Sequence, residues 1–320
     1  MAIDDKELDE LMPATELNWT EDARARMLNV PFFVRKSVVR GIEQYAKDKS
    51  IEVIDDDVVS RARQEREGSA IADAQAKRKA QEQGATGEEK KTPRQFVNFS
   101  FFKLDPAFRR LPQKEIDKGK KELMDVLEEY DNRGDVILLS YTTMGIRADA
   151  EIMFWRVSYK LENFQEMTTK MYRTGLGKYL IQTYSYFSQT KKSMYMDIFD
   201  PEHEEDRTHI IPGKAKYLFI YPFTKKREWY LLTKFTRQGI MDEHIFIGNK
   251  YPSVKLNTTY SFGIDDYEFV VAFETDSPDD FVDLVMDLRE TEGSRFTEED
   301  TPIFTCTAMS LEDAVNSLGI

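Results

Sequence analysis

The fold is decided by a pattern that occurs twice, as Thr142-Thr-Met-Gly-Ile-Arg-Ala-Asp-Ala-Glu-Ile-Met-Phe154 and as Thr259-Tyr-Ser-Phe-Gly-Ile-Asp-Asp-Tyr-Glu-Phe-Val-Val271. Each copy places a glycine in a polar turn between two apolar runs, which predicts a pair of adjacent strands. An internal sequence repeat with this spacing indicates that one structural unit is duplicated in the chain.

The elements expected around the two copies follow in the same order. The first series comprises a strand at 96–104, a helix at 113–130, strands at 136–141 and 150–157, and a helix at 161–172. The second comprises a strand at 217–221, a helix at 237–248, strands at 254–260 and 268–272, a helix at 278–288 and a strand at 303–307. The second series is a β-α-β-β-α-β unit, and the first follows the same order through its second helix. We therefore expect an α+β fold of two ferredoxin-like units, with a pocket between a sheet face and a helix.

Composition excludes several classes of function. A net charge of -13 argues against nucleic-acid binding, which needs a basic surface. One cysteine, Cys306, excludes an internal disulfide and a multi-cysteine metal site. No apolar run approaches the roughly 20 residues of a membrane span. The start, Met-Ala-Ile-Asp-Asp-Lys-Glu, does not resemble a secretion signal, so we expect a cytoplasmic protein.

The chain is expected to contain three segments. Residues 1–64 form a small helical module, in which Thr20 caps one helix, Pro31 begins a second and a third starts near Asp55. Residues 65–94 are charged and poor in large apolar side chains, which is typical of a flexible linker. Residues 95–320 form the duplicated domain.

The helical module resembles a known one. Its pattern Trp-Thr-x-x-Ala, Val-Pro-x-Phe-Val-Arg and Ile-x-x-Tyr-Ala is similar to the C-terminal helical domain of a subunit of light-independent protochlorophyllide reductase. That resemblance implies contact with a protein partner of a tetrapyrrole pathway or with the pigment itself. None of the residues in the module is an evident ligand.

The chain has three histidines, of which His203 and His209 lie in a polar stretch expected to be a loop. His244 lies on an expected helix, in Met241-Asp-Glu-His-Ile-Phe-Ile-Gly-Asn-Lys-Tyr-Pro252. Position alone favours an ordinary surface or core histidine over a haem ligand.

Five ordered motifs change that interpretation. They begin at Met144-Gly-Ile-Arg, Thr183-Tyr-Ser-Tyr, Ile220-Tyr-Pro-Phe, Glu243-His and Phe262-Gly-Ile-Asp. Together they resemble the chlorite dismutase superfamily of haem proteins, whose subunits are duplicated ferredoxin-like units of the dimeric α/β-barrel type and commonly form pentamers. The resemblance implies that His244 is the proximal iron ligand. Its second ring nitrogen needs an acceptor, for which Glu290 or Glu292 is a candidate and a solvated helix end an equal alternative.

Two positions indicate the branch of the superfamily. Where chlorite dismutases carry a distal arginine, this chain has Leu256, which cannot attract chlorite, and Lys255 is expected on the opposite strand face. Tyr221 matches the tyrosine of the coproheme decarboxylase branch. By that resemblance, peroxide oxidises the iron, Tyr221 becomes a radical that abstracts hydrogen from a propionate, and carbon dioxide leaves. Lys225 matches a basic residue near that propionate, as counter-ion or proton donor. For Tyr221 alone, a packed strand aromatic is the alternative.

Coproheme has four propionates and needs several cationic or hydroxyl donors. Arg289 matches a propionate-binding arginine of the family, and Lys214 and Lys216 lie where another basic residue is expected. Tyr184 and Arg147 are weaker candidates, because Tyr184 also suits strand packing and Arg147 suits a turn beside Asp149.

The preferred hypothesis is a hydrogen peroxide-dependent coproheme decarboxylase that makes haem b, with iron coproporphyrin III as substrate and cofactor. The alternatives are a chlorite dismutase, which converts chlorite to chloride and dioxygen, and a non-catalytic haem carrier or sensor. The family implies a homo-oligomer.

Overall fold

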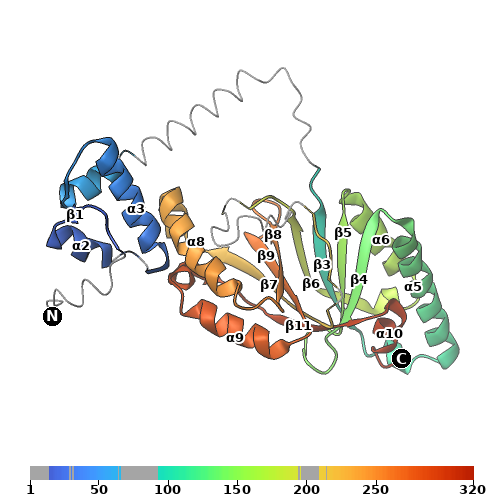
Figure 1. The fold of residues 1–320 in the computed structure, drawn as a ribbon. Coiled ribbons are helices and arrows are strands. Elements are labelled where there is room, and N and C mark those ends of the chain that lie inside the picture. Colours follow the sequence, from blue (N-terminus) through green and yellow to red (C-terminus); the bar gives the residue numbers. More distant parts are fainter. Residues whose placement is uncertain are drawn as a thin grey trace, which may run out of the picture. The chain divides into compact units, whose positions relative to one another are not determined.

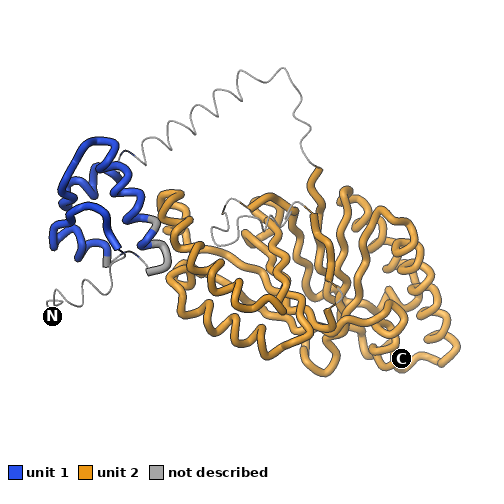
Figure 2. Tube along the Cα trace, viewed as in Figure 1, with its two compact units in different colours: residues 1–91 blue, residues 92–320 orange. Residues whose placement is uncertain are grey.

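The computed structural model describes residues 14–28, 30, 32–63, 65, 93–193, 195, 209–213 and 215–320. The chain divides into two compact units, residues 1–91 and 92–320 (Figure 2). Most of the predicted linker, together with His203 and Lys214, lies outside the described residues. None of the helices that the structure describes is long and apolar enough to cross a membrane.

The first unit contains the helices that the sequence predicts. Strand β1 (Asn18–Trp19) precedes α2 (Glu21–Leu28) and α3 (Phe32–Asp48), strand β2 (Val53–Ile54) pairs with β1, and residues 56–63 are helical. The side chains of Thr20 and Asp55 cap the first and third helices by accepting hydrogen bonds from the N–H groups of Ala23 and Val58.

One buried carboxylate ties the start of this unit to α3. Glu43 Oε1 accepts hydrogen bonds from the N–H groups of Glu16 at 2.7 Å and Leu17 at 3.1 Å, and from Trp19 Nε1 at 3.2 Å. Trp19 packs into a core with Ala23, Met27, Val39 and Ile42. The three hydrogen bonds compensate for removing the Glu43 charge from water.

The second unit confirms the duplication. Its first half contains β3 (Phe96–Leu104), α5 (Gln113–Arg133), β4 (Val136–Thr142), β5 (Ile152–Ser158), α6 (Glu162–Arg173) and β6 (Leu180–Gln189). Its second half contains β7 (Tyr217–Lys225), α7 (Arg227–Leu231), α8 (Lys234–Gly248), β8 (Lys255–Tyr260), β9 (Phe269–Thr275), α9 (Pro278–Arg289) and β11 (Phe304–Met309). Short elements that the sequence did not predict include α7, the 3-10 helix η3 (Glu292–Phe296), β10 (Thr297–Glu299) and the C-terminal α10 (Leu311–Asn316).

Glycine makes both hairpin turns of the duplicated pattern. Gly145 between β4 and β5 has φ 78°, and Gly263 between β8 and β9 has φ 74°. This left-handed conformation costs glycine little, because it has no Cβ. The repeated glycine in the sequence therefore marks the same backbone feature twice.

The strands close into a barrel. Within the halves the order is β4-β5-β3-β6 and β8-β9-β7-β11, and the halves join where β6 pairs with β8 and β11 pairs with β4. Strand β10 pairs with β7 as a further strand. The closed ring leaves the sheet with an inside and an outside, so successive residues of a strand alternate between two environments.

Three apolar clusters fill these environments. Leu218, Ile220, Phe101 and Trp155 belong to the cluster inside the barrel. Outside, α5, α6 and α10 cover the first half, and α8 and α9 cover the second, with the strands between these two groups of helices (Figure 1). Tyr217, Phe219 and Tyr221 of β7 belong to the cluster beneath α9.

Candidate functional site

Helices α5 and α8 occupy equivalent places in the two halves but differ in burial. Helix α5 buries Ile116, Gly119, Leu123, Leu127 and Tyr130. In α8 the one buried residue is Asp242, and the apolar side chains from Ile240 to Ile247 are half-buried. An apolar helix normally buries its inward stripe against the core. The apolar side chains of α8 are therefore less completely covered than those of α5.

His244 lies between two anchored points of that helix face. The side chain of Ile240 packs over Gly293 of η3: a Cβ added to Gly293 would lie 3.5 Å from Ile240 Cγ2. Ile247 packs against the cluster beneath α9. Residues three or four apart are neighbours on a helix surface. His244 therefore lies on the α8 face that runs from η3 to the cluster containing Tyr221.

Tyr221 lies on the outer face of β7. Its ring stacks on Phe273 of β9, with centroids 5.9 Å apart and an interplanar angle of 21°. Burial raises the pKa of its phenol well above the usual range, so the hydroxyl stays protonated. The ring borders a small hollow of about 190 Å³, whose other lining residues are Phe281, Val282, Val285, Met286, Arg289 and Ile303.

Arg289 contributes the cationic side chain of this hollow. It ends α9 and pairs with Asp300, with Nη2 and Oδ2 2.5 Å apart. The Arg289 side chain is 55% exposed, whereas that of Asp300 is 19% exposed. Much of the guanidinium thus remains accessible to an anionic group. Asp300 was missed by the sequence analysis, because nothing in the pattern joins a helix end to a residue eleven positions later.

Lys225 shares the outer face of β7 with Tyr221, because residues four apart on a strand point the same way. Its Nζ donates to the carbonyl of Gly293 at 3.0 Å and lies 4.8 Å from the ring centroid of Trp229. Burial lowers the pKa of Lys225 to about 8, against the opposing effect of Glu268. At neutral pH this half-buried amine is mostly protonated and can meet an anion.

Leu256 lies in the same apolar cluster as Tyr221. It is opposite Phe273 in the β8–β9 register, and it packs in the cluster beneath α9. Lys255 is exposed, and its ammonium donates to the carbonyl of Ile211. The prediction that these neighbours point to opposite faces of the strand is confirmed.

Tyr184 is not brought together with Tyr221. It packs against the cluster inside the barrel, and its hydroxyl donates to Asp149 Oδ2 at 2.6 Å. Arg147 pairs with the same carboxylate, with Nη2 2.6 Å from Oδ2, as expected for a turn. The two donors lower the pKa of Asp149 to about 2. A cofactor-binding role for Tyr184 therefore stays a prediction.

The remaining candidates lie on the surface. Glu290 and Glu292 are exposed, and Glu292 pairs with Arg295 at 2.7 Å, so a role as acceptor for His244 stays a prediction. Lys216 is also exposed, and its ammonium lies 5.2 Å from the ring centroid of Tyr217. His209 lies in a loop, with its ring edge-on to Tyr159.

The chemistry of these donors fits an iron porphyrin. The described residues contain no cluster of three or more His, Cys, Asp or Glu side chains able to hold a metal ion. A porphyrin brings its own four nitrogen ligands, so one imidazole such as that of His244 suffices from the protein. The half-buried apolar face of α8 suits the macrocycle, and Lys225 and Arg289 suit its carboxylates.

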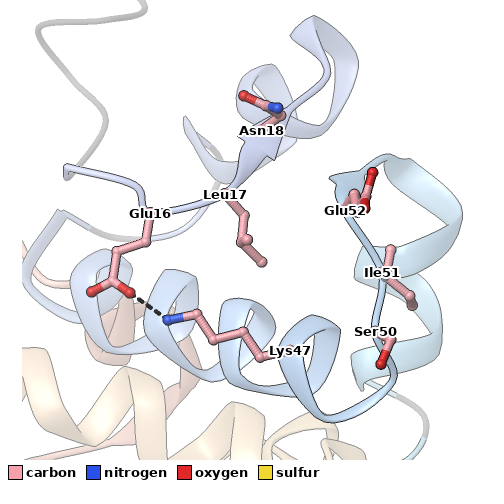
Figure 3. Close-up of a pocket in the computed structure, with 7 residues that line it drawn as sticks. All are labelled: Glu16, Leu17, Asn18, Lys47, Ser50, Ile51 and Glu52. Carbon is pink, nitrogen blue, oxygen red and sulfur yellow. Dashed lines mark hydrogen bonds and ion pairs between the residues drawn. The ribbon is translucent and has the colours of Figure 1, made fainter.

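A separate hollow of about 440 Å³ lies in the first unit. Its lining residues are Glu16, Leu17, Asn18, Lys47, Ser50, Ile51 and Glu52 (Figure 3). Glu16 and Lys47 form an ion pair beside it, and both side chains are exposed. Nothing in this hollow has the burial or donor geometry of a reaction site.

Comparison with known proteins identifies relatives of both units. Residues 19–63 match the family model for the proto-chlorophyllide reductase 57 kD subunit. Among curated proteins, the coproheme decarboxylase of Mycolicibacterium smegmatis is 29% identical over 70% of this chain and 94% of its own length. The coproheme decarboxylase of Staphylococcus carnosus is 29% identical over 59% of this chain and 81% of its own length.

Solved structures share the fold. Chlorite dismutase from Candidatus Nitrospira defluvii in complex with imidazole superposes with a TM-score of 0.62 and 24% identity, covering 71% of this chain and 95% of that one. A haem-binding protein from Thermus thermophilus gives a TM-score of 0.62 and 25% identity, with the same coverage. The family model for chlorite dismutase matches residues 116–309, more than half of the sequence, and the chain belongs to the chlorite dismutase family.

Proposed function

We propose that the protein is a coproheme decarboxylase that uses hydrogen peroxide to convert propionate groups of iron coproporphyrin III to vinyl groups, producing haem b. The arrangement of Tyr221 and Lys225 carries the proposal. Both side chains lie on the outer face of β7. The α8 face that bears His244 contacts Gly293, which binds Lys225, at one end and the apolar cluster that contains Tyr221 at the other. The two curated coproheme decarboxylases among the relatives support it.

The proposed reaction balances for each propionate. The carboxyl carbon leaves as carbon dioxide and one hydrogen leaves from the side-chain carbon attached to the porphyrin ring, so that the two remaining carbons form a vinyl group. The two electrons released, together with the proton from that hydrogen and one further proton from solvent, reduce hydrogen peroxide to two molecules of water. The bound iron supplies the redox chemistry that activates the peroxide.

The protein's own residues have separate roles in this reaction. His244 holds the iron through a neutral imidazole. Tyr221 gives up its hydroxyl proton and one electron together, because burial disfavours the phenolate. The resulting neutral radical takes a hydrogen atom from the propionate. Lys225 and Arg289 bind carboxylates. Leu256 offers no charge or hydrogen bond to an inorganic anion, so we do not favour chlorite as substrate.

The decisive assay loads the protein with iron coproporphyrin III, adds peroxide and follows loss of carbon dioxide by mass spectrometry. Tyr221→Phe should bind the substrate and leave it unchanged. Tyr217→Phe, on the same face of β7, is the matched control and should retain turnover. The proposal fails if the wild type leaves the substrate intact or if Tyr221→Phe converts it equally well.

A second candidate, a haem carrier or sensor, is favoured by the match of residues 19–63 to a tetrapyrrole-enzyme family. In this reading, residues 1–64 recruit a protein of the tetrapyrrole pathway and the second unit delivers or senses haem. Tight haem binding without turnover, with a partner lost on deletion of residues 1–64, would favour it. In either reading we propose a cytoplasmic homo-oligomer, with the pentamer as the expected assembly.

A further inference from the structure

Glu268 is a carboxylate buried beside the end of β7. It immediately precedes β9 and is 9% exposed. Its Oε2 accepts a hydrogen bond from the backbone N–H of Lys225 at 2.8 Å and another from the Tyr230 hydroxyl. A carboxylate removed from water is costly unless hydrogen bonds and a positive charge compensate for it. The two donors provide the hydrogen bonds, and the negative charge that they hold in place acts on the side chains around it.

Lys225 is a half-buried cation whose own backbone N–H contacts Glu268. Its ammonium contacts neutral groups, namely the Gly293 carbonyl and the Trp229 ring. Several other charged groups on the surrounding described elements are exposed: Lys226, Arg227 and Glu228 around α7, Glu292 and Arg295 of η3, and Glu298 and Glu299 of β10. Asp265, Arg237 and Glu243 are half-buried and Asp242 is buried; Asp265 accepts a hydrogen bond from the N–H of Phe187, and Glu243 accepts one from the N–H of Glu292. Water and salt screen exposed charges more than buried ones, so the charge of Glu268 acts on Lys225 more strongly than the exposed charges do.

We propose that Glu268, held by Tyr230, is a positioning residue for Lys225: its negative charge keeps Lys225 cationic at neutral pH and ready to bind a carboxylate of the substrate. The proposal rests on the proposed function for the identity of that carboxylate, but the coupling between Glu268 and Lys225 is a property of the protein alone. The direction in which Glu268 moves the pKa of Lys225 agrees with it.

The first test measures the pKa of Lys225 in the full chain without ligand. Trace acetylation of the amine is followed against pH by mass spectrometry. Glu268→Gln keeps an oxygen that accepts both hydrogen bonds but removes the charge. It should lower the pKa of Lys225 by about one unit, the lower end of the effect of a close opposite charge. In Glu268→Asp, which keeps the negative charge, the pKa of Lys225 should lie between the values in the wild type and in Glu268→Gln. Tyr230→Phe should lower the pKa of Lys225 by less than Glu268→Gln does.

The matched control is Glu299→Gln, which removes an exposed carboxylate from β10 and should leave the pKa of Lys225 unchanged. An unchanged pKa in Glu268→Gln, with thermal unfolding like that of the wild type, overturns the proposal. If Glu268→Gln does not fold, equal values in wild type, Glu268→Asp and Tyr230→Phe overturn it instead.

The second test links the charge to ligand binding. Glu268→Gln should bind iron coproporphyrin III several-fold more weakly than the wild type at pH 8, and equally well at pH 6, where Lys225 is protonated in both. Iron mesoporphyrin dimethyl ester, which has no carboxylates, should bind both proteins alike at both pH values. Equal loss for both porphyrins would show a merely structural effect and contradict the proposal. A wild type that binds but does not decarboxylate would refute the proposed function without affecting this result.

Discussion

The ammonium of Lys225 donates a hydrogen bond to the backbone carbonyl of Gly293 at 3.0 Å, which joins the end of β7 to the 3-10 helix η3. The same 3-10 helix is joined to α8, because the N–H of Glu292 donates to Glu243 Oε2 at 2.9 Å. One short turn therefore fixes both the amine of Lys225 and the helix that carries His244. Neither contact is local in sequence.

Replacing Lys225 with methionine should stabilise the apoprotein at neutral pH. Burial lowers the pKa of Lys225 to about 8 from 10.5. Between these values the unfolded chain binds more protons than the folded one, so wild-type stability rises with pH across this window. Below pH 8 the folded protein bears the full free-energy cost of holding the charged amine of Lys225 in a buried site. We expect Lys225→Met to raise the free energy of unfolding by about 1–3 kcal/mol at pH 7, an advantage that shrinks toward pH 10.5. Denaturant titrations at several pH values measure it, with the exposed Lys216→Met as control; an advantage independent of pH would contradict the explanation.

His244→Ala should weaken binding of haem b and abolish the spectrum of imidazole-ligated iron. Removing a residue that merely hydrogen-bonds a metal ligand typically lowers affinity roughly 10- to 100-fold, so removing the ligand itself should lower haem affinity at least that much. Added imidazole should restore part of the spectrum. His209→Ala, in a loop beside Tyr159, is the control and should behave as the wild type. Identical haem spectra for both variants would exclude His244 as the ligand.

Leu256→Arg should destabilise the protein, because it places a charge opposite Phe273 in an apolar cluster. We expect a loss of about 2 kcal/mol in the free energy of unfolding. Lys255→Arg, on the other face of the same strand, should change it little. Chlorite provides a separate check on the role of Leu256: oxygen release from chlorite by the wild type would show that an apolar residue here does not prevent that reaction.

Regular elements could be predicted because their patterns are local. The expected bounds of α9 and of β3 match the observed ones to within one residue at each end. Helix α7 was missed, since five residues are too few to show a helical period, and β10 has three.

The site was predicted only in part, because alternation along a strand separates two faces without telling which one enters the barrel. Tyr184 and Tyr221 both stand on strands and both match family motifs, yet Tyr184 turns inward to Asp149 and Tyr221 turns outward beneath α9. Contacts such as that of Asp300 with Arg289 and that of Glu268 with the backbone N–H of Lys225 depend on how distant strands, β7 with β9 and β10, pair. Local sequence patterns contain no information on such contacts.

The unequal burial of α5 and α8 has a consequence for local stability. Amide hydrogens exchange through local openings, whose free energy falls where few apolar contacts hold a helix. In the ligand-free protein, the amides of α8 should exchange with deuterium faster than those of α5, although the two helices hold equivalent places in the duplicated units. Addition of an iron porphyrin should slow exchange in α8 and leave α5 unchanged. Duplication would thus have produced one half that is rigid by itself and another that becomes rigid only with its ligand.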